Sequence, residues 1–511
     1  MRKKFVYKVI AIIVICTVSQ AIHAAPGKNP NVIYIQASDL GKGLLSAYGQ
    51  KQFTTPNIDA LIHNGVSFSN AYGGAVTASA RVSLLTGYHD CSKNKWRIAN
   101  GGGYIRRDTA DILNSESLVD DNAIYLPEND LYLPQVFQKA GYLTSQIGML
   151  GAGNISSRQQ MKKYGWDYYY GFLDLVRSNG YYPPFLFENG QMALIEGNTH
   201  VDGGVGFVPE TEYFHQQRWN REGKKSYAPE LFIHKIVELL HEFKDRPFFL
   251  MYCTPLPHGP VSIPEIHPEV ANNEALTPVE KEYASMVKLL DDQVGIIMQA
   301  LRALNLEDNT IIVFSSDNGH DIHYLQSGRI ERPFINRKTG EKFDNIFNKY
   351  YSVTAGDVFN GNAGMAGLKY SNLEGGICVP LAFYWKGKLS KSVCGEMVAG
   401  YDFLPTMADL LRVKLQTKKD GVSFLPALVQ GKKLRSKRYL IAGSSEGPVM
   451  IANDGLKLRY YKDKKQYELY NVRKDPEEKY NVILRFPAEA EKMKKTLLYE
   501  CDDAIGNGIL Q

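Results

Sequence analysis

The chain is organised around one stretch near its start, Ala75-Val76-Thr77-Ala78-Ser79-Ala80-Arg81-Val82-Ser83-Leu84-Leu85-Thr86-Gly87. Small residues lead into it, and the hydroxyl of Thr77 precedes the guanidinium of Arg81 by four positions. The apolar run that follows predicts a helix that ends at Gly87, because glycine is a usual residue at a helix C-terminus. A loop that enters a helix points free backbone N–H groups at a ligand, and Arg81 can hold that ligand through two hydrogen bonds. The stretch therefore indicates a site for an oxyanion.

Two predicted buried strands end in polar residues. Asp39 follows a strand over Asn31–Ala37, and a second strand, over Thr310–Ser316, ends in Asp317 and Asn318. A single aspartate at such a place more often caps the next turn, but the pattern occurs twice. In open α/β sheets ligands bind at the carboxyl ends of the strands, and oxygen ligands suit a hard cation such as Ca²⁺. The pattern therefore favours a cation site at this edge of the sheet.

These motifs resemble those of the sulfatase family, whose signature reads Cys or Ser, then x-Pro/Ser/Ala-x-Arg-x-x-Leu-Leu-Thr-Gly. The segment Arg81–Gly87 fits the signature fully. Further matches occur in the family's order, at Thr55–Leu61, Gly141–Gly148, Tyr164–Phe172, Pro257–Pro260, Gly367–Lys369, Leu373–Pro380 and Asp402–Thr406. The resemblance covers nearly the whole chain after its first residues. It identifies the chain as a member of this family of the alkaline-phosphatase superfamily.

The resemblance implies roles for several side chains. Arg81 and His258 would bind the sulfate, and Lys369 would bind it or protonate the leaving oxygen. The cation of the family, Ca²⁺, would be held by Asp39 and by the Asp317-Asn318 pair. The implied partner is a sulfated or otherwise anionic carbohydrate, and the implied activity is hydrolysis of sulfate esters on glycans or aryl sulfates.

The sequence departs from the family at four positions. Thr77 stands where the family has the Cys or Ser that is oxidised to formylglycine, whose hydrated aldehyde attacks sulfate. Oxidation of a threonine gives a ketone, so formylglycine is excluded at Thr77. Ser38 replaces the first Asp of the metal-binding pair, which is expected to weaken binding of Ca²⁺. Met149 and Gly151 replace a Lys and a His that surround the nucleophile, and neither can supply a charged donor.

A cluster of His320, Asp321 and His323 follows the second strand end. Such a cluster is compatible with a second metal, but a polar loop that lines the cleft is the favoured interpretation. Phosphodiesterase relatives with two zinc ions carry Asp-His at this strand end, whereas this chain carries Asp317-Asn318.

Three functions remain open. In the first, the protein binds an anionic glycan through Arg81, His258 and Lys369, while the family's hydrolysis is weakened, altered or lost. In the second, it is an active hydrolase that uses Thr77 directly on sulfate or phosphate esters, with a loop residue in place of the missing Lys and His. An unmodified threonine is a weak nucleophile unless a base or metal activates it. In the third, it is a non-catalytic structural or partner-binding protein.

The expected fold class is α/β, with a large, mostly parallel mixed sheet flanked by helices and a small C-terminal antiparallel α+β subdomain. We divide the chain into a signal peptide over residues 1–24, a main domain over 25–412 and the C-terminal subdomain over 413–511. Residues 185–226 show no clear periodicity of apolar residues, and we expect them to form long loops over the site. Short strands are expected over Asp420–Pro426, Tyr439–Ala442 and Leu456–Tyr461, and helices over Tyr283–Leu304 and Ala488–Tyr499.

The first residues are typical of a secretory signal peptide: four basic residues, an apolar run over Val9–Val18, and then small residues. The apolar run is too short for a membrane span. Removal of this leader lowers the net charge from +5 to +1, so a basic surface for nucleic acid is not indicated. We therefore expect a secreted or periplasmic protein without a membrane span. The five cysteines beyond the leader form no CxxC pair, which leaves a zinc cluster of that kind unsupported.

Overall fold

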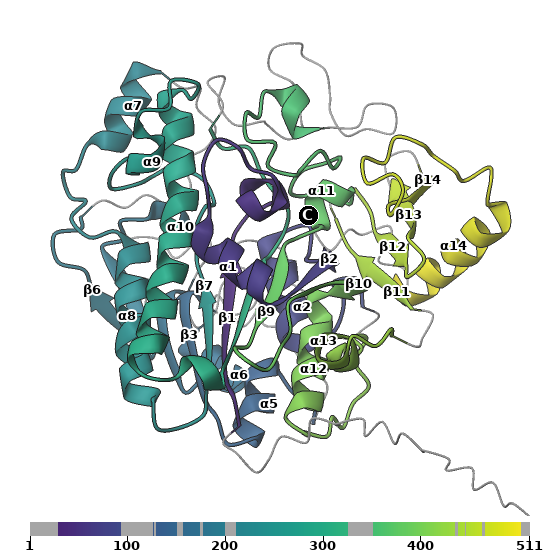
Figure 1. Ribbon diagram of the computed structural model, residues 1–511, viewed down its shortest axis with the longest axis horizontal. Coiled ribbons are helices and arrows are strands. Elements are labelled where there is room, and N and C mark those ends of the chain that lie inside the picture. The colour runs from purple at the N-terminus through teal and green to yellow at the C-terminus, as the bar shows by residue number, and fades with distance from the viewer. Residues whose placement is uncertain are drawn as a thin grey trace, which may run out of the picture.

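The computed structural model contains two sheets with helices packed around them (Figure 1). It describes residues 29–92, 126, 129–150, 157–173, 177–199, 211–324, 351–434, 438–444, 446–461 and 465–501. The signal peptide expected over residues 1–24 lies outside these residues, as does Gly151.

The larger sheet has ten strands in the order β10-β2-β9-β8-β1-β7-β3-β4-β5-β6. Its strands are β1 (Asn31–Ala37), β2 (Val66–Tyr72), β3 (Leu143–Met149), β4 (Tyr168–Phe172), β5 (Phe185–Glu188), β6 (Gln191–Leu194), β7 (Phe248–Cys253), β8 (Thr310–Ser316), β9 (Leu381–Tyr384) and β10 (Ser392–Ala399). Strand β1 is parallel to both of its neighbours, β7 and β8, and every residue of these three strands is buried. Near-continuous apolar strands of this kind belong to parallel sheets covered on both faces. The expected mostly parallel mixed sheet is confirmed.

Helices cover both faces of this sheet. The helices that precede the second sheet in the chain are α1 (Pro56–Asn64), α2 (Thr77–Thr86), α5 (Leu133–Lys139), α6 (Arg158–Tyr164), α7 (Glu212–Trp219), α8 (Ala228–Phe243), α9 (Pro268–Ala271), α10 (Pro278–Ala303), α11 (Glu374–Ile377), α12 (Phe403–Leu410) and α13 (Leu425–Gln430). Alternate residues of β1 face opposite sides, as the pleat of a strand requires. Ile33 and Ile35 pack in the cluster with α1, α8 and α10, whereas Val32 and Tyr34 pack in the cluster with α2, α5 and α12. The sheet is therefore the middle layer of three.

The second sheet is antiparallel and lies at the C-terminal side of the molecule (Figure 1, yellow). It consists of β11 (Tyr439–Ala442), β12 (Val449–Ala452), β13 (Leu456–Tyr461) and β14 (Gln466–Asn471), in that order. Helix α14 (Pro487–Cys501) packs against β12 and β13. This arrangement confirms the expected antiparallel α+β unit at the C-terminal end.

Two expectations about local structure are wrong. Residues 420–426 form no strand. Helix α13 starts at Leu425 instead, and Pro426 fits the first turn of that helix. The segment 185–226 contains regular structure where loops were expected. Strands β5 and β6 form a hairpin there, and Asn189 and Gly190 supply the two left-handed turn residues that a short hairpin loop needs.

Buried ion pairs lie within the C-terminal unit and between its sheet and α11. The Nζ atom of Lys457 on β13 lies 3.0 Å from Glu374 Oε2 and 3.1 Å from Glu478 Oε1. On the same strand, Arg459 Nη1 lies 3.2 Å from Glu468 Oε2. All five side chains are buried. Because loss of one partner leaves a buried charge uncompensated, the Lys457–Glu374 pair fastens the second sheet to the segment that also carries Lys369, whereas Arg459–Glu468 joins β13 to β14.

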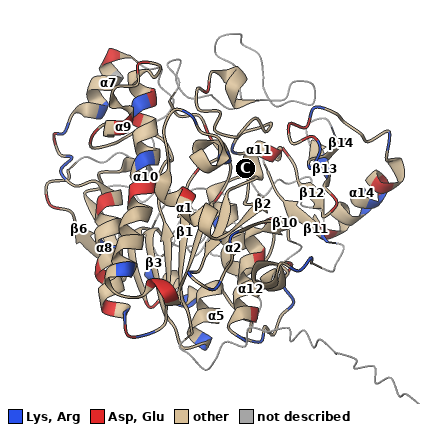
Figure 2. Cartoon of the chain, viewed as in Figure 1, with Lys and Arg blue, Asp and Glu red and all other residues tan. Residues whose placement is uncertain are grey.

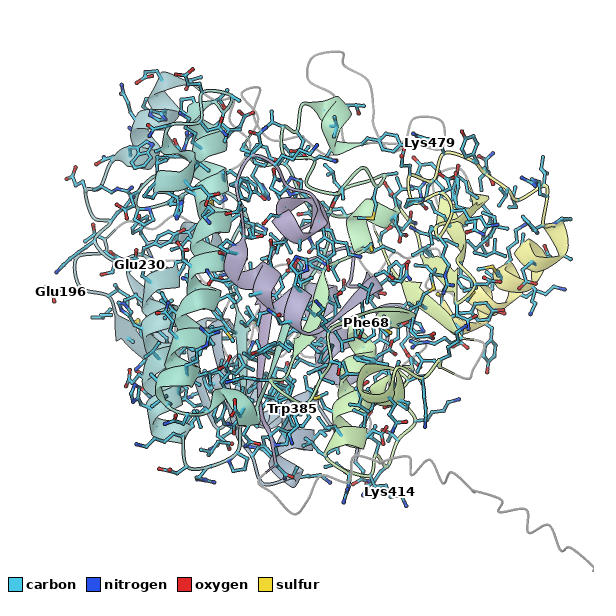
Figure 3. All side chains as sticks on the ribbon, viewed as in Figure 1. Phe68, Glu196, Glu230, Trp385, Lys414 and Lys479 are labelled. Atoms are coloured by element: carbon cyan, nitrogen blue, oxygen red, sulfur yellow. The ribbon has the colours of Figure 1, made fainter. Side chains whose placement is uncertain are left out.

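Charges of both signs are interspersed over the visible helices (Figure 2). Apolar side chains such as Phe68 fill the interior, whereas charged ones such as Glu196 and Lys479 lie at the periphery (Figure 3). None of the helices in the described part of the chain is long and apolar enough to span a bilayer.

Candidate active site

The ends of β1 and β8 bring three predicted site residues together. Ala37 and Ser316 are paired in the sheet, so the residues that follow them leave the sheet side by side. The backbone N–H of Asp39 donates to Asp317 Oδ1 over 3.0 Å. The Asn318 Nδ2 atom donates to Asp39 Oδ1 over 2.9 Å. All three polar side chains are buried at the carboxyl edge of the sheet.

Ser38 takes part in this arrangement through its hydroxyl. The Ser38 Oγ atom donates to Asp317 Oδ2 over 3.1 Å. Burial raises the pKa of the Asp317 carboxyl, and the neighbouring Asp39 carboxylate adds to the rise. The oxygen donors at this edge are therefore two carboxylates, the amide of Asn318 and a hydroxyl, with one carboxylate fewer than the family pattern implies.

The Asp39 carboxylate is surrounded by a lysine and two histidine side chains. Lys369 Nζ lies 2.7 Å from Asp39 Oδ1 and 2.9 Å from Oδ2. The Nε2 atoms of His323 and His258 lie 3.2 and 3.5 Å from Oδ2. Burial acts to raise the pKa of the Asp39 carboxyl, but His258, Lys369 and His323 together hold it well below its ordinary value. Asp39 is thus the anionic centre of a cationic pocket.

Helix α2 carries the predicted oxyanion stretch into this pocket. It begins at Thr77 and ends where Gly87 adopts a left-handed conformation with φ 74°, as predicted from the sequence. Thr77 Oγ1 lies 3.5 Å from Asn318 Oδ1, and the same hydroxyl interacts with the Asp317 carboxyl and opposes the rise in its pKa. The first residue of α2 therefore meets the strand end of β8.

Arg81 lies one turn further along α2 and is fully buried, at 0% exposure. Within the described residues, none of its three side-chain nitrogens has a hydrogen-bond partner. Burial raises the pKa of the Cys253 thiol at the end of β7, and the nearby Arg81 charge opposes that rise. A buried guanidinium without acceptors is costly, since each unmade hydrogen bond leaves a desolvated donor. An anion at this position would supply the missing acceptors.

His258 follows β7 in a loop that is fixed by Tyr181. The Tyr181 hydroxyl donates to the backbone carbonyls of His258 and Pro255 over 2.5 and 2.9 Å. The Nδ1 atom of His258 donates to the carbonyl of Gly259, and Nε2 faces Asp39 Oδ2. The structure therefore brings His258 to the same pocket as Lys369.

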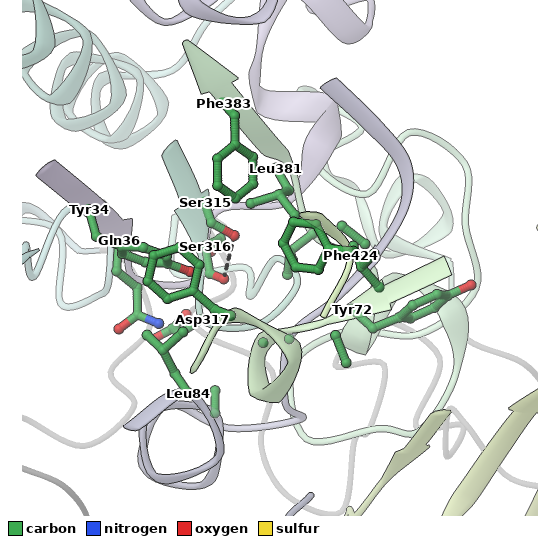
Figure 4. A pocket seen from close by; sticks show the side chains of 18 residues that line it. Tyr34, Gln36, Tyr72, Leu84, Ser315, Ser316, Asp317, Leu381, Phe383 and Phe424 are labelled. Carbon is green, nitrogen blue, oxygen red and sulfur yellow. Dashed lines mark hydrogen bonds between the residues drawn. The ribbon is translucent and has the colours of Figure 1, made fainter. Parts of the chain in front are cut away.

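Met149 ends β3 and is buried, so it provides no charged group where the family has Lys. A small cavity of about 20 Å³ lies beside Asp317 (Figure 4). Its polar wall includes Gln36, Ser315 and Ser316, and its apolar wall includes Leu381, Phe383 and Phe424. This volume is enough for about one water molecule and far too small for a sugar.

The contact of His323 with Asp39 was not predicted from the sequence. His320, Asp321 and His323 were expected to form a polar loop, and in the structure the two histidines have different positions. His320 is fully buried away from Asp39, with Nε2 2.8 Å from the hydroxyl of Tyr324. His323 instead turns back to the pocket. The ligand atoms of Asp39, His258 and His323 all lie within 4.8 Å of one another, so this cluster could hold a metal ion.

Asp90 lies just beyond α2 and gives a testable pH dependence. Its carboxylate accepts the backbone N–H of Gly443 over 2.6 Å and also bonds Ser79, yet burial raises its pKa to about 6. Because this folded-state pKa lies above the unfolded value, protonated Asp90 favours the fold at low pH, and that contribution is lost as the pH rises through 6. We compare the unfolding free energy of Asp90→Asn with that of the parent. From pH 4 to pH 7.5 we expect this difference to shift by about 1–3 kcal/mol in favour of the variant.

The measurement is urea unfolding of both proteins across this pH range. The matched control is Asp308→Asn, because the Asp308 side chain is 78% exposed. The control should differ from the parent by a constant amount at every pH. An Asp90→Asn difference that is equally flat would contradict the assignment of a raised pKa to Asp90.

Comparison with known proteins identifies the family. The family model described as "Sulfatase" matches residues 30–413. The chain belongs to the sulfatase family. A second model, "N-sulphoglucosamine sulphohydrolase, C-terminal", matches residues 368–503 of this sulfatase-family chain.

The sulfatase relatives include glycan sulfatases. An N-acetylgalactosamine-6-O-sulfatase of Bacteroides thetaiotaomicron is 26% identical, over 94% of this chain and 95% of its own length. A solved structure from work on glycosaminoglycan metabolism by Bacteroides thetaiotaomicron aligns with a TM-score of 0.67 at 23% identity, covering 93% of this chain and 100% of its own. Another solved structure, in complex with its substrate D-glucosamine-2-N,6-O-disulfate, aligns with a TM-score of 0.57 at 18% identity and covers 93% and 97%. These structures share the fold of this chain.

Proposed function

We propose that this sulfatase-family protein binds a sulfated or otherwise anionic glycan, and that its sulfate-ester hydrolysis is weakened, altered or lost. The observation that carries the proposal is Arg81 on α2, a buried guanidinium whose nitrogens have no hydrogen-bond partner among the described residues. A sulfate group offers several acceptor oxygens in a geometry that a guanidinium can bind with two parallel bonds. Lys369 and His258 face the same pocket and would add charge-assisted contacts.

The glycan class is supported by the relatives. One relative is named for N-acetylgalactosamine-6-O-sulfate chemistry, and one solved structure holds a disulfated glucosamine. The first name denotes a sugar 6-O-sulfate, and the second ligand is a sugar with one N-sulfate and one O-sulfate. The charged side chains of Arg81 and Lys369 would select the same anionic groups.

Weakened hydrolysis follows from the groups around Thr77. The family's formylglycine cannot form at Thr77, and the Lys and His that accompany it are replaced by Met149 and Gly151. Each lost transition-state contact costs about 10²–10³ in rate on the scale measured for single donors. Binding of the anion does not need these three groups, so it can persist where turnover is lost.

Calcium is the cation that we propose for the strand-end site. Asp39, Asp317 and Asn318 would hold it, because their oxygens meet at one edge of the sheet and oxygen ligands fit Ca²⁺. Bound there, the ion would supply positive charge beside the anion. Ser38 lowers the number of carboxylates and Lys369 shares Asp39, so we expect weak binding. Addition of 10 mM Ca²⁺, about the millimolar range of weak sites, should raise the melting temperature after EDTA treatment, and Asp317→Asn should remove most of the rise.

A second candidate function is favoured by the contact between Thr77 and Asp317. The pKa of Asp317 is raised by burial and by Asp39, and a carboxyl with a raised pKa beside a hydroxyl is suited to act as a general base. In this alternative Thr77 attacks a sulfate or phosphate ester directly. The third possibility, a partner-binding protein without ligand, predicts no stabilisation by sulfated saccharides or by Ca²⁺.

The test is turnover by the mature protein on sulfated oligosaccharides, aryl sulfates and phosphate mono- and diesters, with Thr77→Ala and Thr77→Ser beside it. Binding of the same saccharides is measured by calorimetry. We expect binding without rapid turnover, and residual turnover that does not change in Thr77→Ala. Rapid release of sulfate or phosphate that Thr77→Ala abolishes and Thr77→Ser retains would establish the second candidate instead.

We further propose export of the protein to the periplasm or the medium, on the basis of its N-terminal leader. N-terminal sequencing of the protein from the periplasmic and medium fractions tests this. A mature chain that begins after Ala21 or Ala24 is expected, whereas an intact Met1 in the cytosolic fraction would contradict export.

A further inference from the structure

Two of the five described cysteines, Cys91 and Cys501, meet in one buried cluster although most of the chain separates them. Cys91 lies in the described segment just beyond α2, and Cys501 is the last residue of α14. Their exposed fractions are 6% and 1%. The cluster that contains both is formed by apolar residues of the second sheet and of α14. The fold therefore places two thiols from distant parts of the sequence in the same apolar surroundings.

The position of Cys91 is fixed by the end of β11. The backbone N–H of Gly443, the residue after β11, donates to Asp90 Oδ1 over 2.6 Å. A Cβ on Gly443 would come within 2.8 Å of Cys91 Sγ, so the lack of a side chain there leaves room for the sulfur. The segment beyond α2 is thus docked on the second sheet, with the sulfur of Cys91 against its backbone.

Helix α14 brings Cys501 to the same place. Its buried residues recur every three or four positions, the spacing of one helical face, and they are Ala490, Met493, Leu497 and Cys501. Cys501 therefore lies on the face of α14 that packs on the second sheet. A hydrogen bond with the Cys501 thiol raises the pKa of the Cys91 thiol well above its ordinary value, and burial adds to the rise. The two thiols are therefore direct neighbours.

The other three described cysteines lie elsewhere. Cys253 ends β7, where its sulfur lies beside the amide groups of Gln36 and Gln146. Cys378 follows α11, and Cys394 is a partly exposed residue of β10. None of these three belongs to the cluster that contains Cys91 and Cys501. The described cysteines thus offer one pair for a covalent bond.

We propose that Cys91 and Cys501 form a disulfide bond, which links the segment beyond α2 to the C-terminal helix. One thiolate attacks a disulfide of the oxidant, either glutathione disulfide or a thiol–disulfide oxidoreductase, and the second thiolate displaces the resulting mixed disulfide. The two cysteines lose two protons and two electrons, and the oxidant's disulfide is reduced to two thiols. An oxidising compartment, such as the destination proposed above, would preserve the bond.

The burial of both thiols determines when the bond forms. A thiol in apolar surroundings is rarely ionised, and only the thiolate attacks a disulfide. Oxidation should therefore be slow in the folded, reduced protein and fast while the chain refolds, before α14 packs on the second sheet. Because α2 carries Thr77 and Arg81, the bond would anchor the segment that follows the proposed anion-binding helix.

The experiment is a thiol count on the mature protein, which is reduced, unfolded and then refolded with mixtures of reduced and oxidised glutathione. Titration in denaturant should find five thiols in the reduced protein and three in the oxidised protein, since five cysteines follow the leader. Peptide mass mapping without reductant should find the peptide of Cys91 joined to that of Cys501. The oxidised protein should melt about 2–4 °C above the reduced protein, because the bond closes a very long loop in the unfolded chain.

Cys91→Ala and Cys501→Ala should each keep four thiols after the same treatment and show no difference in melting temperature between the two conditions. Cys394→Ala is the matched control, because Cys394 is more exposed than either proposed partner. It should retain both the bond and the shift. Melting curves of the reduced variants show whether each one folds.

Two results overturn the proposal. The first is five thiols in the parent protein at every glutathione ratio, and the second is a bond that includes Cys253, Cys378 or Cys394. The thiol count needs neither a saccharide nor Ca²⁺. Its outcome is therefore independent of the proposed glycan function.

Discussion

Replacement of Arg81 by methionine is expected to stabilise the free protein and to abolish its binding of sulfated saccharides. The guanidinium is at 0% exposure and, among the described residues, its nitrogens have no hydrogen-bond partner. Removal of one buried unsatisfied polar group recovers about 1–3 kcal/mol, which raises the melting temperature of a large domain by several degrees. Methionine has a similar length and fills most of the space.

The loss of affinity has a separate cause. Two charge-assisted hydrogen bonds to a sulfate are worth about 1.5–3 kcal/mol each, so Arg81→Met should weaken binding by about 10²–10⁴-fold. Calorimetry with a sulfated oligosaccharide measures the affinity, and thermal unfolding without ligand measures the stability. Arg302→Met is the control, because the Arg302 side chain is 58% exposed and should change neither quantity. Unchanged affinity in Arg81→Met would remove the basis of the proposed function.

Replacement of Lys457 by methionine is expected to cost about 3–5 kcal/mol of unfolding free energy. The ammonium lies between Glu374 and Glu478, and all three groups are buried. Its removal leaves two carboxylates close together without a cation. Burial already raises the pKa of Glu478, and Glu374 adds to that rise, so protonation of one carboxyl will recover part of the loss.

Urea unfolding measures the effect, and two further variants define it. In Lys386→Met the lost ammonium is 51% exposed, so this surface change should cost less than about 1 kcal/mol. The double variant Lys457→Met/Glu478→Gln should be more stable than Lys457→Met, since one buried charge has been removed. A single variant as stable as the parent would show that the pair does not hold the second sheet in place.

The fold was predictable because its central strands are visible in the sequence as runs of apolar residues. Asn31–Ala37 and Thr310–Ser316 are uniformly buried, and the polar residues after them lie at one sheet edge for the geometric reason used in the prediction. The hairpin of β5 and β6 was missed because its four-residue strands are too short to show a period. The Asn189-Gly190 pair was the feature of the sequence that could have indicated this hairpin, because Asn-Gly favours a two-residue hairpin turn.

The pocket was predictable only in part. The ends of β1 and β8 fix the positions of Asp39 and Asp317, and Lys369 and His258 both lie against Asp39. The direction of a side chain in an irregular loop has no such rule. His320 and His323 are three residues apart in one polar segment, yet one is buried against Tyr324 and the other contacts Asp39. Nothing in the spacing distinguishes them.

The strand order of the larger sheet has a consequence for how the chain folds. Strand β1 pairs with β7 and β8, and Val66 of β2 pairs with Ser392 of β10, 326 residues further along the chain. Contacts of such long sequence separation form slowly, because the loop entropy is lost before the pairing is gained. An N-terminal fragment that stops before β10 therefore lacks the partner of β2 and exposes its edge. Completion of the larger sheet must therefore await the synthesis of β10, which ends at Ala399.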